Sequence, residues 1–161
     1  MIDNRLANIL DISKNTYIGV DIGINGGIAF IYDDMLYTFK ISNDTKYLAH
    51  RLSNVLRMFT NDKVICYIEK QQAFPRQGVS STFKLGYGYG IVTGTIEALG
   101  IPTVHIRPKQ WMSHYTLPKD KKDRKNTLKT MAQDLYPSHK VVLWNSDAIM
   151  LAHYAKSTHR F

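Results

Sequence analysis

The 161-residue chain carries 21 Lys and Arg against 13 Asp and Glu, which gives a formal net charge of +8 at pH 7. Its length and its 44% content of hydrophobic residues suit one globular domain and argue against a separate second domain. The positive charge favours an anionic partner, with nucleic acid first and an anionic membrane surface second. No apolar run approaches the roughly 20 residues of a membrane span, so we expect a soluble protein.

The single cysteine and the start of the chain bear on its compartment. Cys66 has no second cysteine with which to form a disulfide inside the chain. Residues 1–15 lack the apolar centre of a signal peptide, and we interpret them as an N-terminal extension. We therefore expect an intracellular protein whose single domain covers residues 16–161.

Three extended segments open this domain. Residues 17–32 are rich in strand-forming side chains and are broken at the Asn-Gly-Gly of residues 25–27. Residues 35–41 form a third extended segment after an Asp-Asp turn at residues 33–34. Three short strands in succession predict an antiparallel meander.

Helices and short strands alternate in the rest of the chain. We expect helices at 45–61 (capped by Asn43 or Asp44), 79–99, 124–135 and 146–156, and strands at 63–69 and 102–106. This order predicts an α/β fold with a five-stranded mixed sheet, three strands antiparallel and then two parallel, flanked by helices. A right-handed crossover would place strand 63–69 beside the first strand, which makes Asp21 and Glu69 neighbours.

Three acids stand at the ends of predicted elements. Asp21 precedes a glycine-rich turn, Glu69 ends an apolar strand, and Asp147 opens the last helix. One such acid is often an ordinary turn residue, but carboxylates about 4 Å apart repel by roughly 4 kcal/mol at an effective dielectric of 20. A divalent cation removes the repulsion, and oxygen ligands favour Mg²⁺ or Mn²⁺ over zinc. The three acids therefore predict a metal site that could hydrolyse a phosphodiester.

The same glycine-rich turn has a second interpretation. The pattern D-x-G-x-x-G at residues 21–26 also begins the sugar kinases and actin-like ATPases, whose hairpin holds phosphate through backbone N–H groups. Those folds place two such domains around a nucleotide cleft, and the chain shows no second phosphate loop. We therefore favour the nuclease.

Four segments together resemble a known family. They are YIGVDIGINGGIA, CYIEKQQAFPRQGVSSTFKLGYGYGIVTG, IPTVHIRPKQWMSHYTLP and SDAIMLAHYAK, between about residues 17 and 156. In this order they resemble the RuvC-type Holliday junction resolvases, especially the phage-type relatives, within the RNase H-like superfamily. The resemblance implies an RNase H-like nuclease domain in which Asp21, Glu69 and Asp147 bind catalytic Mg²⁺, with Mn²⁺ able to substitute.

The resemblance also implies a substrate and an assembly. The expected protein is a homodimer that cuts two opposed strands of a four-way DNA junction, in the bacterial cytoplasm if a phage encodes it. Two alternatives stay open. One is an endonuclease of the same fold that cuts branched or flap DNA in general, and the other is a junction-binding protein with weak or no cleavage.

A basic run and a loop are the candidate DNA contacts. Residues 117–129 concentrate positive charge, which forms either a solvated face or a set of phosphate contacts, and the overall basicity favours the contacts. Relatives often place a lysine from this region near the scissile phosphate. Phe74, in the loop after Glu69, either stacks on an unpaired base or anchors the loop. The candidates are Phe74, Arg76, Lys84, Lys119, Lys121, Lys122, Arg124 and Lys125.

Glycines mark one face of the predicted helix at 79–99. Gly86, Gly90 and Gly94 recur every four residues, and each costs about 1 kcal/mol of helix propensity relative to alanine. Something is therefore expected to approach this face. It is either a close-packed neighbour inside the domain or the same helix of a second protomer across a two-fold axis, with Tyr87 and Tyr89 flanking the contact.

The resemblance fails at one point of the candidate site. Relatives usually add an acid or histidine about one turn before the last Asp, where this chain has Leu143 and Trp144. His153 lies about 240° round the helix from Asp147, and Asn145 is expected to cap the helix with its side chain. We therefore predict three carboxylates with water completing the metal shell, and no metal role for the histidines.

Overall fold

A computed structural model describes residues 15–23, 25–59, 63–73 and 75–161. The elements in chain order are β1 (Thr16–Asp21), β2 (Gly27–Tyr32), β3 (Met35–Lys40), α1 (Thr45–Met58), β4 (Val64–Glu69), α2 (Val79–Ala98), β5 (Thr103–Ile106), α3 (Pro108–Met112), α4 (Lys121–Leu135) and α5 (Ser146–Thr158). The strands form one sheet in the order β3-β2-β1-β4-β5. The first three are antiparallel, and β4 and β5 run parallel to β1, which confirms the predicted sheet.

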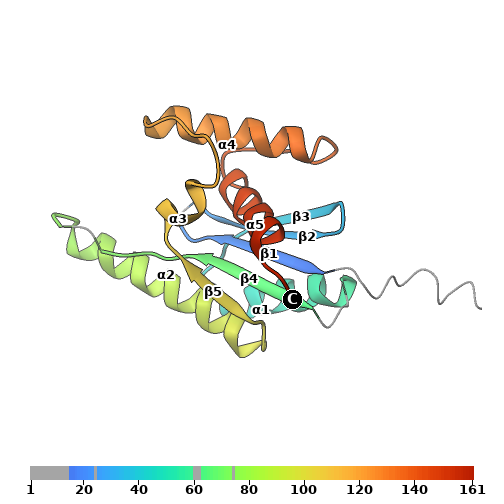
Figure 1. Cartoon of the computed structure of the whole chain (residues 1–161). Coiled ribbons are helices and arrows are strands. Elements are labelled where there is room, and N and C mark those ends of the chain that lie inside the picture. The colour runs from blue at the N-terminus through green and yellow to red at the C-terminus, as the bar shows by residue number, and fades with distance from the viewer. Residues whose placement is uncertain (1–14, 24, 60–62, 74) are drawn as a thin grey trace, which may run out of the picture.

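Helices cover both faces of the sheet. Helices α1 and α2 lie on one face, and α5 lies on the other with α4 above it (Figure 1). Alternate residues of β1 feed the two cores: Ile18 and Val20 pack with α1 and α2, whereas Tyr17 packs on the side of α4 and α5. Successive side chains of a strand point to opposite faces of the sheet. A strand that is covered on both faces is therefore apolar at almost every position.

The helices differ from the sequence prediction at several points. Helix α4 begins at Lys121 instead of residue 124, because the Asp120 side chain accepts hydrogen bonds from the backbone N–H groups of Lys122 and Asp123. The short helix α3 was not predicted, although Pro108 at its first turn is typical of a helix start. Helix α1 ends at Met58, with Phe59 as its C-cap, before the predicted end near Asn61. The N-terminal extension, apart from Asn15, lies outside the described residues.

Helix α5 packs directly on β1 because Gly19 has no side chain. A Cβ atom at Gly19 would lie 2.2 Å from the carbonyl oxygen of Ala148 and 2.4 Å from the backbone nitrogen of Ala152. No other residue type permits this approach without a shift of backbone. The contact fixes the start of α5, and with it Asp147, beside the last residues of β1.

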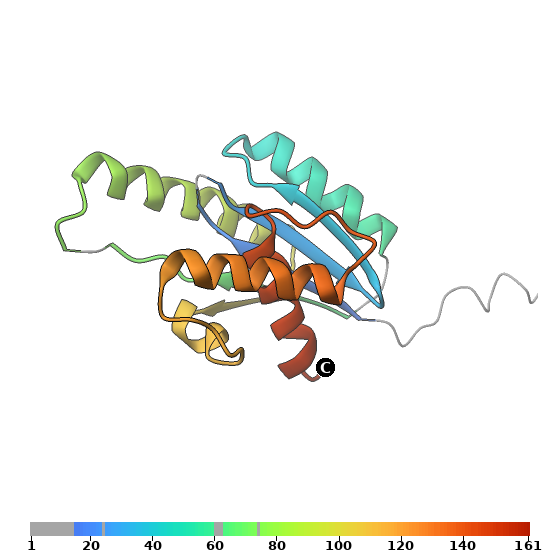
Figure 2. The same ribbon diagram turned by 90° about the horizontal axis from the view of Figure 1, so that it is seen from above.

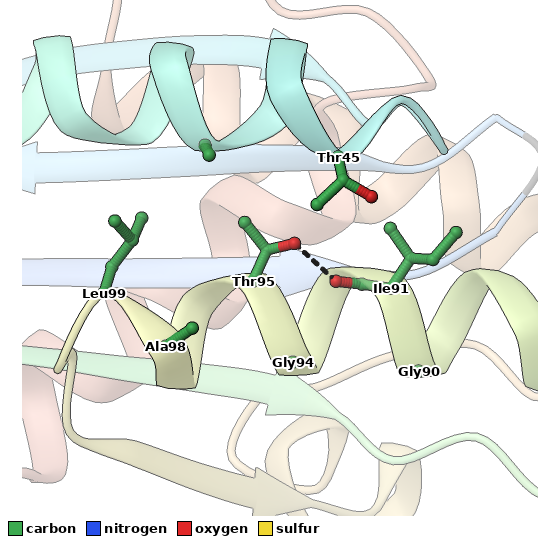
Figure 3. Close-up of a pocket in the computed structure, with 8 residues that line it drawn as sticks. Thr45, Gly90, Ile91, Gly94, Thr95, Ala98 and Leu99 are labelled. Atoms are coloured by element: carbon green, nitrogen blue, oxygen red, sulfur yellow. Dashed lines mark hydrogen bonds between the residues drawn. The ribbon is translucent and has the colours of Figure 1, made fainter.

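The glycine face of α2 is open. Cβ atoms built at Gly86, Gly90 and Gly94 would meet no atom within 4 Å apart from the adjoining backbone of α2. The predicted close packing of this face inside the domain is therefore wrong for the described residues. It is Gly88 that packs closely, 3.3 Å from the Asn43 side chain. Gly90 and Gly94 instead border a hollow of about 360 Å³ between α1 and α2 (Figure 3).

No helix among the described residues combines the length and the apolar character needed to cross a membrane.

Candidate metal centre and nucleic-acid interface

One row of residues crosses the whole sheet at the end where β1 finishes. Asp21 pairs with Gly27 of β2, and Gly27 pairs with Lys40 of β3. On the other side Val20 is opposite Ile68, which makes Glu69 the neighbour of Asp21. Residues directly opposite in neighbouring strands point to the same face, so this row lies on the face covered by α5. The predicted adjacency of Asp21 and Glu69 is confirmed.

Asp147 reaches the same place from the first turn of α5. Its side chain is buried, accepts a hydrogen bond from the Ser146 hydroxyl at 3.2 Å, and lies 3.9 Å from the Lys125 ammonium. The start of a helix also favours a negative side chain, because the free N–H groups there carry partial positive charge. Lys125 therefore reaches from α4 to the acids.

Trp111 holds the Glu69 carboxylate and was not anticipated from the sequence. This side chain of α3 is fully buried, and its indole N–H donates to Glu69 Oε2 at 2.9 Å. Sequence offers little to reveal such a contact, since the two residues lie far apart in the chain. The signal available was a tryptophan shortly after the strand that neighbours Glu69.

The electrostatics of the acids show that they share one environment. Burial and the negative charges of Asp147 and Glu69 together raise the pKa of Asp21 to about 7, although the positive charge of Lys125 acts in the opposite direction. Burial also raises the pKa of Glu69, although the hydrogen bond from Trp111 lowers it. Burial likewise raises the pKa of Asp147, and the positive charge of Lys125 lowers it. A nearby cation stabilises the charged form of partly buried carboxylates of this kind.

The same residues are not gathered around one point. Among the described residues, no group of three His, Cys, Asp or Glu side chains is close enough together to hold a metal ion ready-made. The mutual effects on the pKa of Asp21 nevertheless place Asp147 and Glu69 within electrostatic reach of it. A cation bound between the three carboxylates would draw them together, because it would remove their mutual repulsion. Their all-oxygen donor set fits Mg²⁺ or Mn²⁺.

The predicted DNA contacts fall into two groups. Lys121 and Lys122 are exposed in the first turn of α4, close in sequence to Lys125. Lys119 is exposed and its carbonyl oxygen accepts from Arg124 at 3.2 Å, which ties the preceding loop to the helix.

Arg76 and Lys84 form the second group. They are exposed on the loop after β4 and on α2, which project beyond the sheet at the same end as the start of α4 (Figures 1 and 2). Arg76 has a φ of 68°, in the left-handed region. Phe74 lies outside the described residues, so its role stays a prediction.

Asn145 occupies the N-cap position of α5, but its predicted capping hydrogen bond is wrong. Its Oδ1 accepts from the Val142 N–H at 2.8 Å, and its Nδ2 donates to the Lys140 carbonyl and the Thr38 hydroxyl. The φ and ψ of Asn145 are helical, which turns its side chain toward the preceding loop. The side-chain amide of Asn145 therefore makes its hydrogen bonds to groups other than the three acids.

The histidines have other partners. His153 Nδ1 lies 3.1 Å from the Tyr136 hydroxyl, and His105 lies between the Tyr89 hydroxyl and Glu97. His114 packs edge-on against aromatic rings. That these histidines have no metal role stays a prediction.

Solved structures with the same fold share their architecture with most of the chain. RuvC of T. thermophilus in complex with Holliday junction substrate superposes with a TM-score of 0.60 at 18% identity, covering 88% of this chain and 92% of that one. A second Thermus thermophilus RuvC structure gives a TM-score of 0.58 at 16% identity, covering 88% of this chain and 95% of that one. No family model and no curated protein matches the sequence. The likeness shows the fold, and the predicted RuvC-type, RNase H-like architecture is confirmed.

Proposed function

We propose that this protein is a metal-dependent endonuclease that resolves four-way DNA junctions as a homodimer. The observation that carries the proposal is that Asp21, Glu69 and Asp147 lie within electrostatic reach of one another at one end of the sheet, with the ammonium of Lys125 3.9 Å from Asp147. Carboxylates that can bind a metal cation thus lie beside an ammonium group that can bind phosphate. A neighbour of the same fold, at 18% identity, is bound to a Holliday junction, which supports branched DNA as the substrate.

Each residue has a definite part in the proposed chemistry. Bound Mg²⁺ would activate a water molecule and stabilise the leaving oxygen of the phosphodiester. Asp21, Glu69 and Asp147 would hold the metal, and the Trp111 N–H keeps one oxygen of Glu69 in a fixed orientation. Lys125, now beside Asp147, would bind the phosphate charge when DNA is present.

Incubation with labelled DNA and Mg²⁺ or Mn²⁺ tests the proposal. We expect paired, symmetry-related cuts in a four-way junction and slower or no cutting of three-way and flap substrates. Equal cutting of all branched substrates would favour the general branched-DNA endonuclease. Tight junction binding without cuts in either metal would favour the junction-binding protein.

The metal dependence should reflect the small number of ligands. With three carboxylates, and with Leu143 and Trp144 where relatives have a further ligand, we expect half-maximal cleavage only at high Mg²⁺. Mn²⁺ should activate better because it accepts less regular geometry. Metal titrations of the cleavage rate test this, and full activity at low Mg²⁺ would contradict it.

The basic start of α4 should contribute a measurable share of DNA affinity. Replacing Lys121, Lys122 and Lys125 together with Gln removes up to three phosphate contacts. The slope of log affinity against log salt should therefore become shallower by roughly 2 to 3. Fluorescence anisotropy of a labelled junction across a salt series measures it. An unchanged slope would mean that these lysines form a solvated face and do not contact phosphate.

The open face of α2 is the proposed dimer contact. Val79, Phe83 and Tyr87, at spacings of four residues, are 88%, 72% and 56% exposed, and this is unusual for large apolar side chains. Together with Gly86, Gly90 and Gly94 they give a surface that a second copy of α2 could cover.

Gly90→Leu is expected to give a folded monomer. The position is open within one chain, so the added side chain fits there and clashes only with a second protomer. Sedimentation velocity gives the assembly state, and circular dichroism checks folding. A well-folded dimer of the variant would place the contact elsewhere.

A further inference from the structure

Lys40 occupies the outer end of the residue row that contains Asp21. The pairs Asp21 with Gly27 and Gly27 with Lys40 place it two strands away on the same face. With strands about 4.8 Å apart, the two Cα atoms are separated by about 10 Å. That distance corresponds to about three nucleotides along the axis of one DNA strand.

The Lys40 side chain rests on an aromatic ring. Its ammonium lies 5.8 Å from the centre of the Trp144 ring. That ring fills the space over Gly27, where a Cβ atom would come within 2.9 Å of it. Trp144 stands three residues before Asp147, so the ring joins the start of α5 to the sheet beside the acids.

The charge of Lys40 is held in place without being neutralised. The residue is exposed, and within the described part of the chain no carboxylate forms an ion pair with it. An aromatic face attracts the ammonium weakly and leaves its N–H donors free for an anion. A lysine at the end of an edge strand has another use, however, because such charges prevent sheets from joining edge to edge.

We propose that Lys40, supported by Trp144, binds a backbone phosphate of the DNA close to the cleaved bond. The subsite is separate from the basic start of α4, because it lies on β3 at the edge of the sheet. It rests on the proposed function, since it supposes that DNA reaches the acids. The ammonium would donate to the phosphate oxygens while the indole face keeps the side chain over the row.

Lys63 provides a matched control. It is also exposed and immediately precedes β4, whereas Glu69 ends that strand. Six residues of strand put about 20 Å between the two positions. Lys63→Gln therefore makes the same change of charge at the opposite end of the sheet.

The test compares junction binding of Lys40→Gln, Lys40→Arg and Lys63→Gln in metal-free buffer over a salt series. One lost phosphate contact predicts a slope shallower by about 0.9 for Lys40→Gln, and about eightfold weaker binding at 0.1 M salt. Lys40→Arg should restore the wild-type slope, and Lys63→Gln should not change it. Trp144→Leu keeps the charge and should weaken binding about two- to fivefold at an unchanged slope.

The outcomes separate this inference from the proposed function. If the wild-type protein binds and cuts junctions but Lys40→Gln behaves like Lys63→Gln, the subsite is wrong and Lys40 serves only to protect the sheet edge. If the wild-type protein binds no branched DNA, the proposed function and the subsite are both overturned. A weakening by Lys40→Gln that Lys40→Arg does not reverse would also contradict a phosphate contact.

Discussion

Asp21→Asn is expected to reduce metal-dependent cleavage of a four-way junction by about three orders of magnitude or more. The substitution keeps the size of the side chain and removes the charge that would bind the cation, whose stabilisation of the transition state is worth several kcal/mol. Glu69→Gln and Asp147→Asn should behave alike. Asp134→Asn, an exposed acid near the end of α4, is the matched control and should cut normally.

The same variant should gain stability without metal, which distinguishes a lost ligand from a damaged fold. Burial, together with the charges of Asp147 and Glu69, raises the pKa of Asp21 from 3.8 to about 7, so the folded protein holds this proton more tightly than the unfolded chain. The stability that Asp21 contributes is then lost as pH rises from about 4 to about 7. At pH 8 the penalty is up to about 4 kcal/mol, and Asn removes it.

Urea unfolding of the metal-free proteins at pH 4 and pH 8 measures this. Asp21→Asn should be more stable than the wild type at pH 8 and about equal to it at pH 4. Near wild-type cleavage by the variant would show that Asp21 is not a metal ligand. Lost cleavage with lower stability at pH 8 would instead point to a disturbed fold.

The neighbouring positions of Asp21 and Glu69 could be predicted because they depend on backbone rules. Alternating and continuous apolar patterns identify strands, and the right-handed crossover decides which strands are adjacent. Once β4 lies parallel to β1, the residues at the two strand ends must meet. The prediction that Asp147 belongs to the site depended on a weaker signal, namely that an acid stands at the start of the last helix.

Contacts of single side chains could not be predicted in this way. The hydrogen bond from Trp111 to Glu69 joins a five-residue helix to a distant strand. The Asn145 amide turned to the preceding loop because its backbone is helical, and no sequence pattern specifies that angle. Lys40 was missed since its place in the row appears only when the register of three strands is known.

Gly19→Ala is the second change with a large expected effect, on stability. The new methyl group would stand 2.2 Å from the Ala148 carbonyl oxygen and 2.4 Å from the Ala152 nitrogen, both parts of a backbone that cannot turn aside. Overpacking of this kind costs up to about 3 kcal/mol, and more where only backbone can yield. Helix α5 would then have to move away from β1.

Gly86→Ala makes the same chemical change in open space. Within one protomer, no atom outside the adjoining backbone of α2 lies within 4 Å of the new methyl group, and alanine is the better residue inside a helix by up to about 1 kcal/mol. The two substitutions should therefore change the free energy of unfolding in opposite directions, as measured by urea denaturation with an unchanged dependence on denaturant.

The functional consequence of Gly19→Ala follows from Asp147. This acid stands at the start of the displaced helix, one residue before Ala148, so its distance from Asp21 should grow even in the molecules that stay folded. Cleavage per folded molecule should fall well below that of the wild-type protein, because misplacement of a ligand weakens the metal site. If Gly19→Ala were as stable and active as the wild-type protein, α5 would not rest on β1, and Asp147 would not lie beside Asp21.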